Sequence, residues 1–352
     1  MSVDSATAPG RVCPTRYRYG AAAIAGAPER SAQTLYAIGG LYGNLPALDA
    51  IEAMARAEPG PVALCFNGDF NWFNIDDAGF RAINRRVAQH AFIVGNVEAE
   101  LGADADDAGC GCAYPESVDD AVVARSNLIH AALKRTAARH RDLLAGLQES
   151  ASPLPRSLSQ REREAVCLLS PSGREVGREG LAQRWRVGDL RIGVVHGDAD
   201  SLAGWRFDAA RLDDPAESEW RAAAFAAAGV DMFASSHTCL PAMRCFDYQG
   251  EKLVANNGAA GMPNFAGTEF GILTRIGLQA SPHAPLYGHA LRDVHVDALA
   301  VRYDPAAWQK MFLANWPAGS AAWLSYFRRI ADGPDYQPRQ AFPTTMETCR
   351  KP

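Results

Sequence analysis

Short apolar segments alternate with helix-like segments over the first hundred residues, and this alternation constrains the fold more than any other feature. Strands are predicted at Thr34–Ile38, Pro61–Phe66 and Ala91–Val94, and amphipathic helices at Leu45–Ala57 and Asp76–His90. Such a pattern is typical of an α/β core, in which the loops that follow the strands carry the site.

The α/β pattern stops after residue 100 and returns near residue 183. An Ala/Asp-rich loop, the stretch GCGCAYP, two predicted helices and a Ser/Pro/Arg-rich segment fill the interruption. We interpret it as an inserted helical cap, with helices at Asp119–Ala138 and His140–Glu149. The predicted parts are a flexible N-terminal arm (1–33), a core (34–100 and 183–280), the cap (101–182), and a C-terminal strand and helical extension (281–352).

The second half of the core has its own predicted elements. They are a hairpin at Gln183–His196, a helix at Glu219–Ala228, and strands at Asp231–Ser235, Lys252–Ala255 and Phe270–Ile276. A last strand is expected at Val294–Tyr303, before helices at Pro305–Trp316 and Ala321–Ile330.

Charge and hydropathy exclude several classes of protein. The 352 residues carry a formal net charge of −5, which gives no basic field for nucleic acid or an anionic membrane. No apolar run approaches the roughly 20 residues that span a bilayer, and the N-terminus lacks an apolar signal core. The irregular spacing of the eight cysteines indicates that most of them are free thiols. We expect a cytoplasmic protein, and the sequence does not indicate its oligomeric state.

Four polar motifs stand where predicted strands end. They are NGD at Asn67–Asp69, GNVE at Gly95–Glu98, VHGD at Val195–Asp198 and SSHTC at Ser235–Cys239. Strand ends of one sheet meet at one edge, so the polar side chains of these motifs should lie together. The resulting ligand set suits a divalent transition metal such as Mn, Fe or Zn, and its members are Asp69, Asn96, His196 and His237.

The order of these motifs resembles the calcineurin-like metallophosphoesterases. Members of that family carry Asp-x-His, Gly-Asp, Gly-Asn-His, a later His and Gly-His-x-His, followed by an Asn-Pro-Gly-Ser type of turn. Here GGLYGNLPALDAI is similar to the first block, and VANNGAAGMPN at Val254–Asn264 to the closing turn. The resemblance implies a sandwich of two facing mixed β-sheets flanked by helices, and a hydrolase that acts on phosphate esters through a metal-activated water.

The departures from the family pattern fall on one side of the site. Gly40 and Tyr42 replace the Asp and His of the first block, and Cys239 replaces the last His. Val97 replaces the His that commonly protonates the leaving group. Because the other ligand set remains, the resemblance implies one bound ion rather than two.

Several side chains are candidates for the missing functions. Asn96 is predicted to be catalytic as well as a ligand, Glu98 to act as a base or supporting acid, and Tyr42 either to donate to substrate or to fill space. Cys239 is an alternative thiolate ligand. Asn44, at a helix N-terminus, and Trp72 are predicted to contact substrate.

The close pair Cys110 and Cys112 has two interpretations. The pair is either a glycine-rich turn with inert thiols, which is slightly favoured, or it folds back to join Cys239 at the vacated metal position and to contact substrate. Two functions also stay open. One is a metallophosphoesterase acting on a phosphodiester, nucleotide or small phosphate ester. The alternative is a weak or inactive pseudo-phosphoesterase that binds a metal, a ligand or a protein partner.

Overall fold

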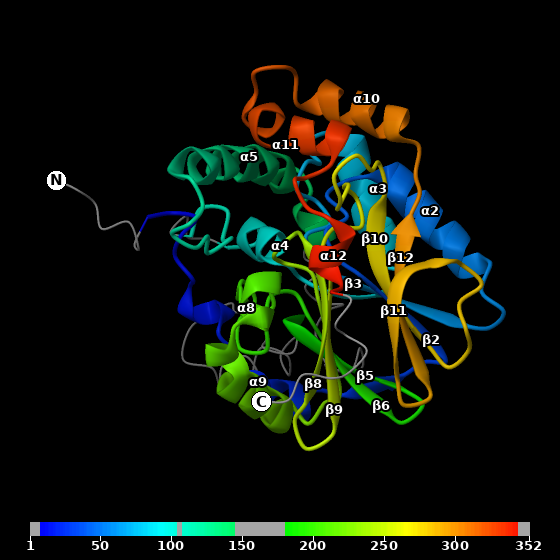
Figure 1. Cartoon of the computed structure of the whole chain (residues 1–352). Coiled ribbons are helices and arrows are strands. Elements are labelled where there is room, and N and C mark those ends of the chain that lie inside the picture. The colour runs from blue at the N-terminus through cyan, green and yellow to red at the C-terminus, as the bar shows by residue number, and fades with distance from the viewer. Residues whose placement is uncertain (1–7, 104–107, 145–179, 344–352) are drawn as a thin grey trace, which may run out of the picture.

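The computed structural model describes residues 8–103, 108–144 and 180–343. Its strands form two six-stranded sheets that contain both parallel and antiparallel pairs. The sheets face each other, with helices on their outer sides (Figure 1). The predicted α/β sandwich of two mixed sheets is therefore confirmed.

The first sheet has the strand order β11-β12-β10-β2-β3-β4. The strands β2, β3 and β4 run parallel, while β10 is antiparallel to β2, and β12 and β11 continue antiparallel. Their bounds are β2 (Thr34–Ile38), β3 (Val62–Asn67), β4 (Ala91–Ile93), β10 (Gly271–Gly277), β11 (Pro285–Leu291) and β12 (Val294–Val301).

The second sheet has the order β1-β5-β6-β7-β9-β8. The strands β6, β7 and β9 run parallel, and β5 and β8 pair antiparallel with β6 and β9. Their bounds are β1 (Glu29–Ser31), β5 (Ala182–Val187), β6 (Leu190–Val195), β7 (Met232–Ser235), β8 (Pro241–Asp247) and β9 (Glu251–Asn257).

Strand β2 shows why its sequence is apolar throughout. Leu35 and Ala37 pack between the two sheets, whereas Tyr36 and Ile38 face the helices outside the first sheet. Successive side chains of a strand point to opposite faces, so a strand covered on both sides needs apolar residues at every position. All five residues of β2 are buried.

Helices close both outer faces of the sandwich. The first sheet is covered by α2 and its neighbours, and the second by α1 and α9. The helix bounds are α1 (Ala21–Gly26), α2 (Leu45–Arg56), α3 (Asp77–Val87), α4 (Asn96–Leu101), α5 (Asp120–Ala138), α8 (Ala209–Asp213), α9 (Ser218–Ala228), α10 (Pro305–Asn315), α11 (Ala321–Asp332) and α12 (Pro338–Ala341). Short 3₁₀ turns lie at Thr15–Tyr17 and Pro215–Glu217.

Both predicted end segments prove to be part of the fold. Residues from 8 onward do not form a flexible arm, because β1 pairs with β5 and because Tyr17 and Ile24 are buried. The C-terminal strands are not an extension either. Strand β12 pairs with β10, and β11 pairs with β12, so both strands are part of the first sheet. Helices α10 and α11 cover the outer face of that sheet.

The predicted cap is only partly within the described residues. Its first helix is present as α5, and Ile129 and Leu133 of this helix join the core that α2 and α3 form over the first sheet. The second predicted helix of the cap, His140–Glu149, lies only partly within the described residues, because residues 145–179 are outside them. Among the described helices, none is both long and apolar enough to cross a bilayer.

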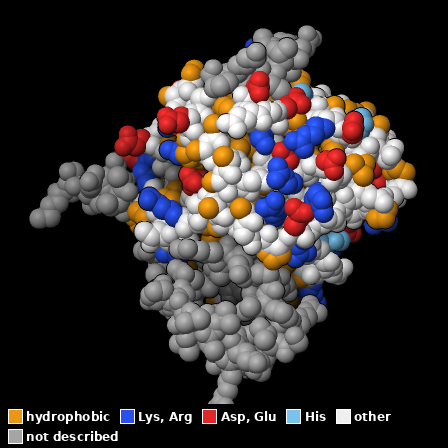
Figure 2. All heavy atoms as spheres, turned by 90° about the horizontal axis from the view of Figure 1, so that it is seen from below, with side chains coloured by type: hydrophobic (Ala, Val, Ile, Leu, Met, Phe, Trp, Pro, Cys, Tyr) orange, Lys and Arg blue, Asp and Glu red, His pale blue; other side chains and the backbone are white. Residues whose placement is uncertain are grey.

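Basic and acidic side chains are mixed on the face shown in Figure 2. An ion-pair cluster of the same mixed kind lies at the strand ends opposite the site, where buried Asp231 pairs with Arg191, Lys252 and Arg292. The charges of these three basic side chains are therefore partly balanced within the protein.

Candidate metal centre

Asp69 lies in a tight turn directly after β3. Both Gly68 and Asp69 have positive φ, at 95° and 54°. The Oδ1 atom of Asp69 lies 3.4 Å from His196 Nε2, and it accepts the N–H of Val97 at 3.2 Å. A Cβ atom on Gly95 would lie 2.2 Å from this oxygen, so only glycine at position 95 leaves room for the carboxylate.

The two buried histidines are oriented by backbone carbonyls. His196 Nδ1 lies 2.7 Å from the carbonyl oxygen of Asn67, and His237 Nε2 lies 3.1 Å from that of Cys112. Because a carbonyl only accepts, each of these nitrogens must carry the proton. The other nitrogens, His196 Nε2 and His237 Nδ1, are then turned toward each other at 3.1 Å.

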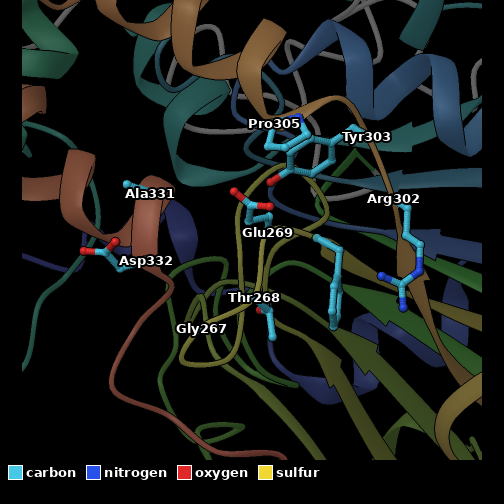
Figure 3. A pocket seen from close by; sticks show the side chains of 9 residues that line it. Gly267, Thr268, Glu269, Arg302, Tyr303, Pro305, Ala331 and Asp332 are labelled. Carbon is cyan, nitrogen blue, oxygen red and sulfur yellow. The ribbon is translucent and has the colours of Figure 1, made fainter.

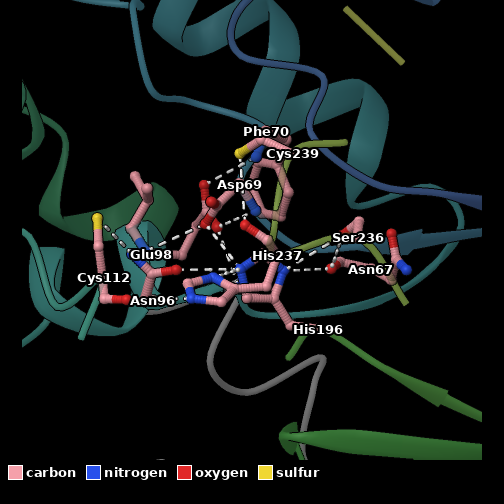
Figure 4. Close-up of polar contacts among 12 residues, drawn as sticks. Asn67, Asp69, Phe70, Asn96, Glu98, Cys112, His196, Ser236, His237 and Cys239 are labelled. Carbon is pink, nitrogen blue, oxygen red and sulfur yellow. Dashed lines mark hydrogen bonds and ion pairs between the residues drawn. The ribbon is translucent and has the colours of Figure 1, made fainter. Parts of the chain in front are cut away.

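Asn96 completes the set from the first turn of α4. Its Oδ1 lies 3.0 Å from His196 Nε2, and its Nδ2 donates to the carbonyl oxygen of Cys110 at 2.9 Å. The ligand atoms of Asp69, His196 and His237 all lie within 4.8 Å of one another. Two oxygens and two ring nitrogens thus meet at one place (Figure 4).

This donor set fits a divalent transition metal. Metal-bound histidines almost always donate their second N–H to a carbonyl or carboxylate, which is the arrangement of both rings here. Two carbonyl-anchored imidazoles leave two lone pairs facing each other, and only a proton or a cation between them removes the repulsion. The mixture of carboxylate, amide and imidazole suits Mn, Fe or Zn.

The charges of the cluster respond to one another. Burial opposes charge on Asp69 and His196, yet their attraction lowers the pKa of Asp69 and raises that of His196. Burial and then the charge of His196 lower the pKa of His237 to about 3. Without a metal, a proton added to the cluster therefore goes to His196 rather than to His237.

Glu98 supports the site without facing it. Its two oxygens accept the backbone N–H groups of Asp69, Phe70, Asn71 and Gly95, together with the side-chain amide of Asn71. Burial, followed by the charge of Asp69, raises the pKa of Glu98 to about 7, against the pull of these donors. Because both oxygens are occupied, the geometry does not fit the predicted role as a base, and Glu98 is a positioning residue.

The GCGC loop, residues 108–114, contacts the candidate ligands mainly through carbonyls, with one thiol contact in which Cys112 Sγ lies 3.4 Å from Asn96 Nδ2. Its alternate residues Gly109, Gly111 and Ala113 have positive φ, and the carbonyls of Cys110 and Cys112 between them accept from Asn96 and His237. The Cys112 carbonyl also accepts from Trp205 Nε1 at 3.0 Å. This loop therefore orients two of the four candidate ligands.

The predicted thiolate site is not formed. Among the described residues, the side-chain group that includes Asp69 and both histidines contains no cysteine. The sulfur atoms of Cys112 and Cys239 lie apart in Figure 4. Burial raises the pKa of both thiols, which favours the uncharged form over a ligating thiolate. The expectation that Cys110 or Cys112 joins Cys239 around a metal is wrong for this geometry.

Tyr42 occupies the vacated position. A Cβ atom on Gly40 would lie 2.8 Å from the ring and hydroxyl of Tyr42, so the ring fills the space above that glycine. Tyr42 Oη lies 2.9 Å from Cys239 Sγ, and this sulfur also contacts the carbonyl oxygen of His237 at 3.3 Å. A buried phenol and a partly buried thiol thus pair at the positions where the resemblance places ligands.

Two predicted substrate contacts have structural roles instead. Asn44 caps α2 by accepting from Ala47 N, and its Nδ2 donates to the carbonyl oxygen of Gly261. It is fully buried, so its amide is not free for an anion. Trp72 is 3% exposed and packs against Phe73 and Tyr326. Neither geometry fits a substrate contact.

Some supporting residues were not singled out from the sequence. The carbonyl of Asn67 fixes His196, and Trp205 packs its ring on His237 with centroids 5.2 Å apart. Asn67 could have been found because it belongs to the NGD motif, whereas Trp205 lies in none of the motifs. A separate cavity of about 540 Å³ lies beside Glu269, Arg302 and Tyr303 (Figure 3), and no candidate ligand lines it.

No protein-family model matches this chain, and no curated protein matches it in sequence. Similar solved structures include a metallophosphoesterase from Sphaerobacter thermophilus, at 18% identity and a TM-score of 0.46, covering 86% of this chain and 99% of that one. A 5'-nucleotidase precursor from Thermus thermophilus is 13% identical, with a TM-score of 0.34 and coverage of 80% and 58%. Vps29 from Chaetomium thermophilum is 13% identical, with a TM-score of 0.31 and coverage of 78% and 98%.

Proposed function

We propose that this protein is a metal-dependent phosphoesterase that hydrolyses a phosphodiester, nucleotide or small phosphate ester. One observation supports this most: four donor atoms converge while the outer nitrogens of Asn96, His196 and His237 are anchored on backbone carbonyls. These residues and Asp69 would hold one Mn, Fe or Zn ion. Such an ion lowers the pKa of a coordinated water and polarises a phosphoryl oxygen.

The residues around the donor set define what the chain itself supplies. The two carbonyl-anchored rings are held in the tautomer that presents lone pairs to a cation. Val97 has no proton to give to a leaving group, and the hydroxyl of Tyr42 is hydrogen-bonded to Cys239. Esters with poor leaving groups should therefore be hydrolysed slowly.

A pseudo-phosphoesterase is the second candidate, and the position of Tyr42 favours it. Its ring closes the space above Gly40, and His196 is fully buried. Such a site could retain a cation, a ligand or a protein partner without turnover.

Metal content and hydrolysis together separate the two candidates. Purified protein is reconstituted with Mn, Fe or Zn, its metal per chain is measured by elemental analysis, and a panel of aryl and alkyl phosphate esters is assayed. The enzyme proposal expects about one ion per chain and faster cleavage of activated aryl esters. One ion without turnover across the panel favours the pseudo-phosphoesterase. No bound ion contradicts the enzyme proposal and favours a pseudo-phosphoesterase that binds a ligand or a protein partner instead of a metal.

A further inference from the structure

Arg329 of α11 reaches the Tyr42 and Cys239 pair from outside the family-like motifs. Its Nη2 donates to the carbonyl oxygen of Cys239 at 2.6 Å, and its Nε donates to that of Pro263 at 3.2 Å. The side chain therefore joins the loop after β7 to the turn after β9. It belongs to the C-terminal segment, for which the sequence predicted no part in the site.

The positive charge of Arg329 acts on both groups of the pair. Burial raises the pKa of the Cys239 thiol and of the Tyr42 phenol, and the guanidinium opposes that rise in each case. The negative charge of Asp69 acts on both groups in the opposite direction. The Tyr42 and Cys239 pair is thus close enough to interact with both the carboxylate of Asp69 and the guanidinium of Arg329.

Arg329 has hydrogen-bonding capacity left over. A guanidinium carries five N–H groups, and its two bonds to carbonyl oxygens use two of them, which leaves three without a partner among the described residues. The residue is partly exposed. A planar guanidinium with several unused donors is the side chain best suited to bind phosphate oxygens.

We propose that Arg329 binds a phosphoryl oxygen of the substrate and supplies, beside the Tyr42 and Cys239 pair, the positive charge that a second metal ion would otherwise provide. The ligand class, a phosphate ester or its phosphate product, rests on the proposed function. The position of the charge rests on the contacts of Arg329 alone. A loss of phosphate affinity with an unchanged metal content is the signature of this role.

A purely structural role makes a different prediction. If Arg329 only ties two loops together through their carbonyls, its replacement lowers thermal stability and leaves phosphate affinity unchanged. Arg328 provides a matched control, since it is the preceding residue on the same helix, carries the same charge and is exposed. Arg328→Gln changes the net charge equally without touching the Cys239 carbonyl.

The test measures binding of inorganic phosphate to metal-loaded full-length protein by isothermal titration calorimetry. We expect Arg329→Gln to weaken phosphate binding by about 10- to 100-fold, the loss typical of a charge-assisted hydrogen bond. We expect Arg329→Lys to lose less, because it keeps the charge, and Arg328→Gln to match wild type. Metal per chain should stay the same in all variants, and Arg329→Lys serves if Arg329→Gln does not fold.

The outcomes separate this inference from the proposed function. Equal phosphate affinity in wild type and both Arg329 variants overturns the inference, even if the wild type hydrolyses esters. Loss of bound metal in Arg329→Gln also overturns it, because the residue would then act through the metal centre. A wild type that binds no phosphate overturns it as well. If phosphate binds through Arg329 but no ester is hydrolysed, the inference stands and the enzyme proposal fails.

Discussion

The two halves of the site are built from the same strand-end loops but hold their polar atoms differently. On the Asp69 side, the second polar atom of each of Asn96, His196 and His237 is anchored on a carbonyl. On the Tyr42 side, phenol and thiol bond to each other. The Asp69 side presents lone pairs that a cation can accept. On the Tyr42 side the polar groups bond to each other and require no cation.

This difference is concentrated in two neighbouring positions of one loop. His237 and Cys239 are separated by a single residue after β7, yet His237 turns toward His196 and Cys239 turns toward Tyr42. A positive φ of 61° at Cys239 accompanies this divergence. The comparison teaches that two nearby positions of one loop can hold an open ligand set on one side and a hydrogen-bonded phenol and thiol on the other.

The largest effect is expected from His237→Ala. Removing a ligand should lower metal affinity by more than the roughly 10- to 100-fold that loss of a supporting partner costs. Cys239→Ala is the matched variant in the other half and should keep its metal. Elemental analysis after gel filtration measures both, with circular dichroism to check folding. Equal metal loss in the two variants would erase the distinction between the halves.

The next effect concerns the GCGC loop. In Gly111→Ala the new Cβ would lie 2.3 Å from Tyr17 Oη at a φ of 67°, so the loop must shift away from the ligands that it orients. We expect metal affinity to fall by about 10- to 100-fold. Gly319→Ala is the control, because Gly319 has a φ of 86° with no atom within 4 Å of the new Cβ. Competitive metal titration that finds both variants unaltered would contradict the role of the loop.

Metal affinity should also depend on pH, through the titration of groups on the Asp69 side of the site. His196 has a raised pKa, so below that pKa a proton occupies Nε2 and must leave before a cation binds. His237, with a pKa of about 3, and Asp69, with a lowered pKa, add no further proton near neutrality. Glu98, with a pKa of about 7, is not a ligand and adds a smaller dependence through its interaction with Asp69. Apparent affinity should therefore fall about tenfold per pH unit below the pKa of His196 and change less steeply above it.

Calorimetry in buffers of different ionisation enthalpy counts the protons released on metal binding. One proton on the acidic side is the expected result. Two protons would mean that Glu98 or His237 is protonated as well, and none would mean that His196 is neutral without the metal.

The smallest effect is expected from Tyr42→Phe. The substitution removes the hydrogen bond to Cys239 and keeps the ring that fills the space above Gly40. The free energy of unfolding should fall by about 0.5–1.5 kcal/mol, the usual net value of one hydrogen bond, while metal content stays unchanged. Denaturant unfolding measures the first quantity. A drop in metal content would show that the phenol belongs to the metal half.

Much of the fold could be predicted from apolar patterns, because β2 and β3 are buried on both faces. The strand β1 was missed since its three residues, Glu29–Ser31, are all exposed. The strand β11 is also largely exposed and has no clear alternation. A strand whose side chains are exposed is held mainly by backbone hydrogen bonds, so its sequence shows no apolar pattern by which it could be predicted.

The residue types of the site could be predicted, but their orientation could not. Asp69, Asn96, His196 and His237 follow strands, and the structure brings all four together. The carbonyls of Cys110 and Cys112 decide where two of them point, and a carbonyl is common to every residue type. Arg329 was missed for a related reason, since its contacts depend on where the C-terminal helix packs.

Contrary to the prediction, the four candidate ligands do not project from one sheet but divide between the two sheets. Asp69 and Asn96 follow β3 and β4 of the first sheet, whereas His196 and His237 follow β6 and β7 of the second. A cation bound by all four would cross-link the sheets at one edge of the sandwich, so the sheets could not separate without its release. Binding to the native state alone stabilises a protein in proportion to the logarithm of free metal. Opening of this edge, measured by hydrogen exchange in β3 and β6, should therefore become slower as the metal concentration rises.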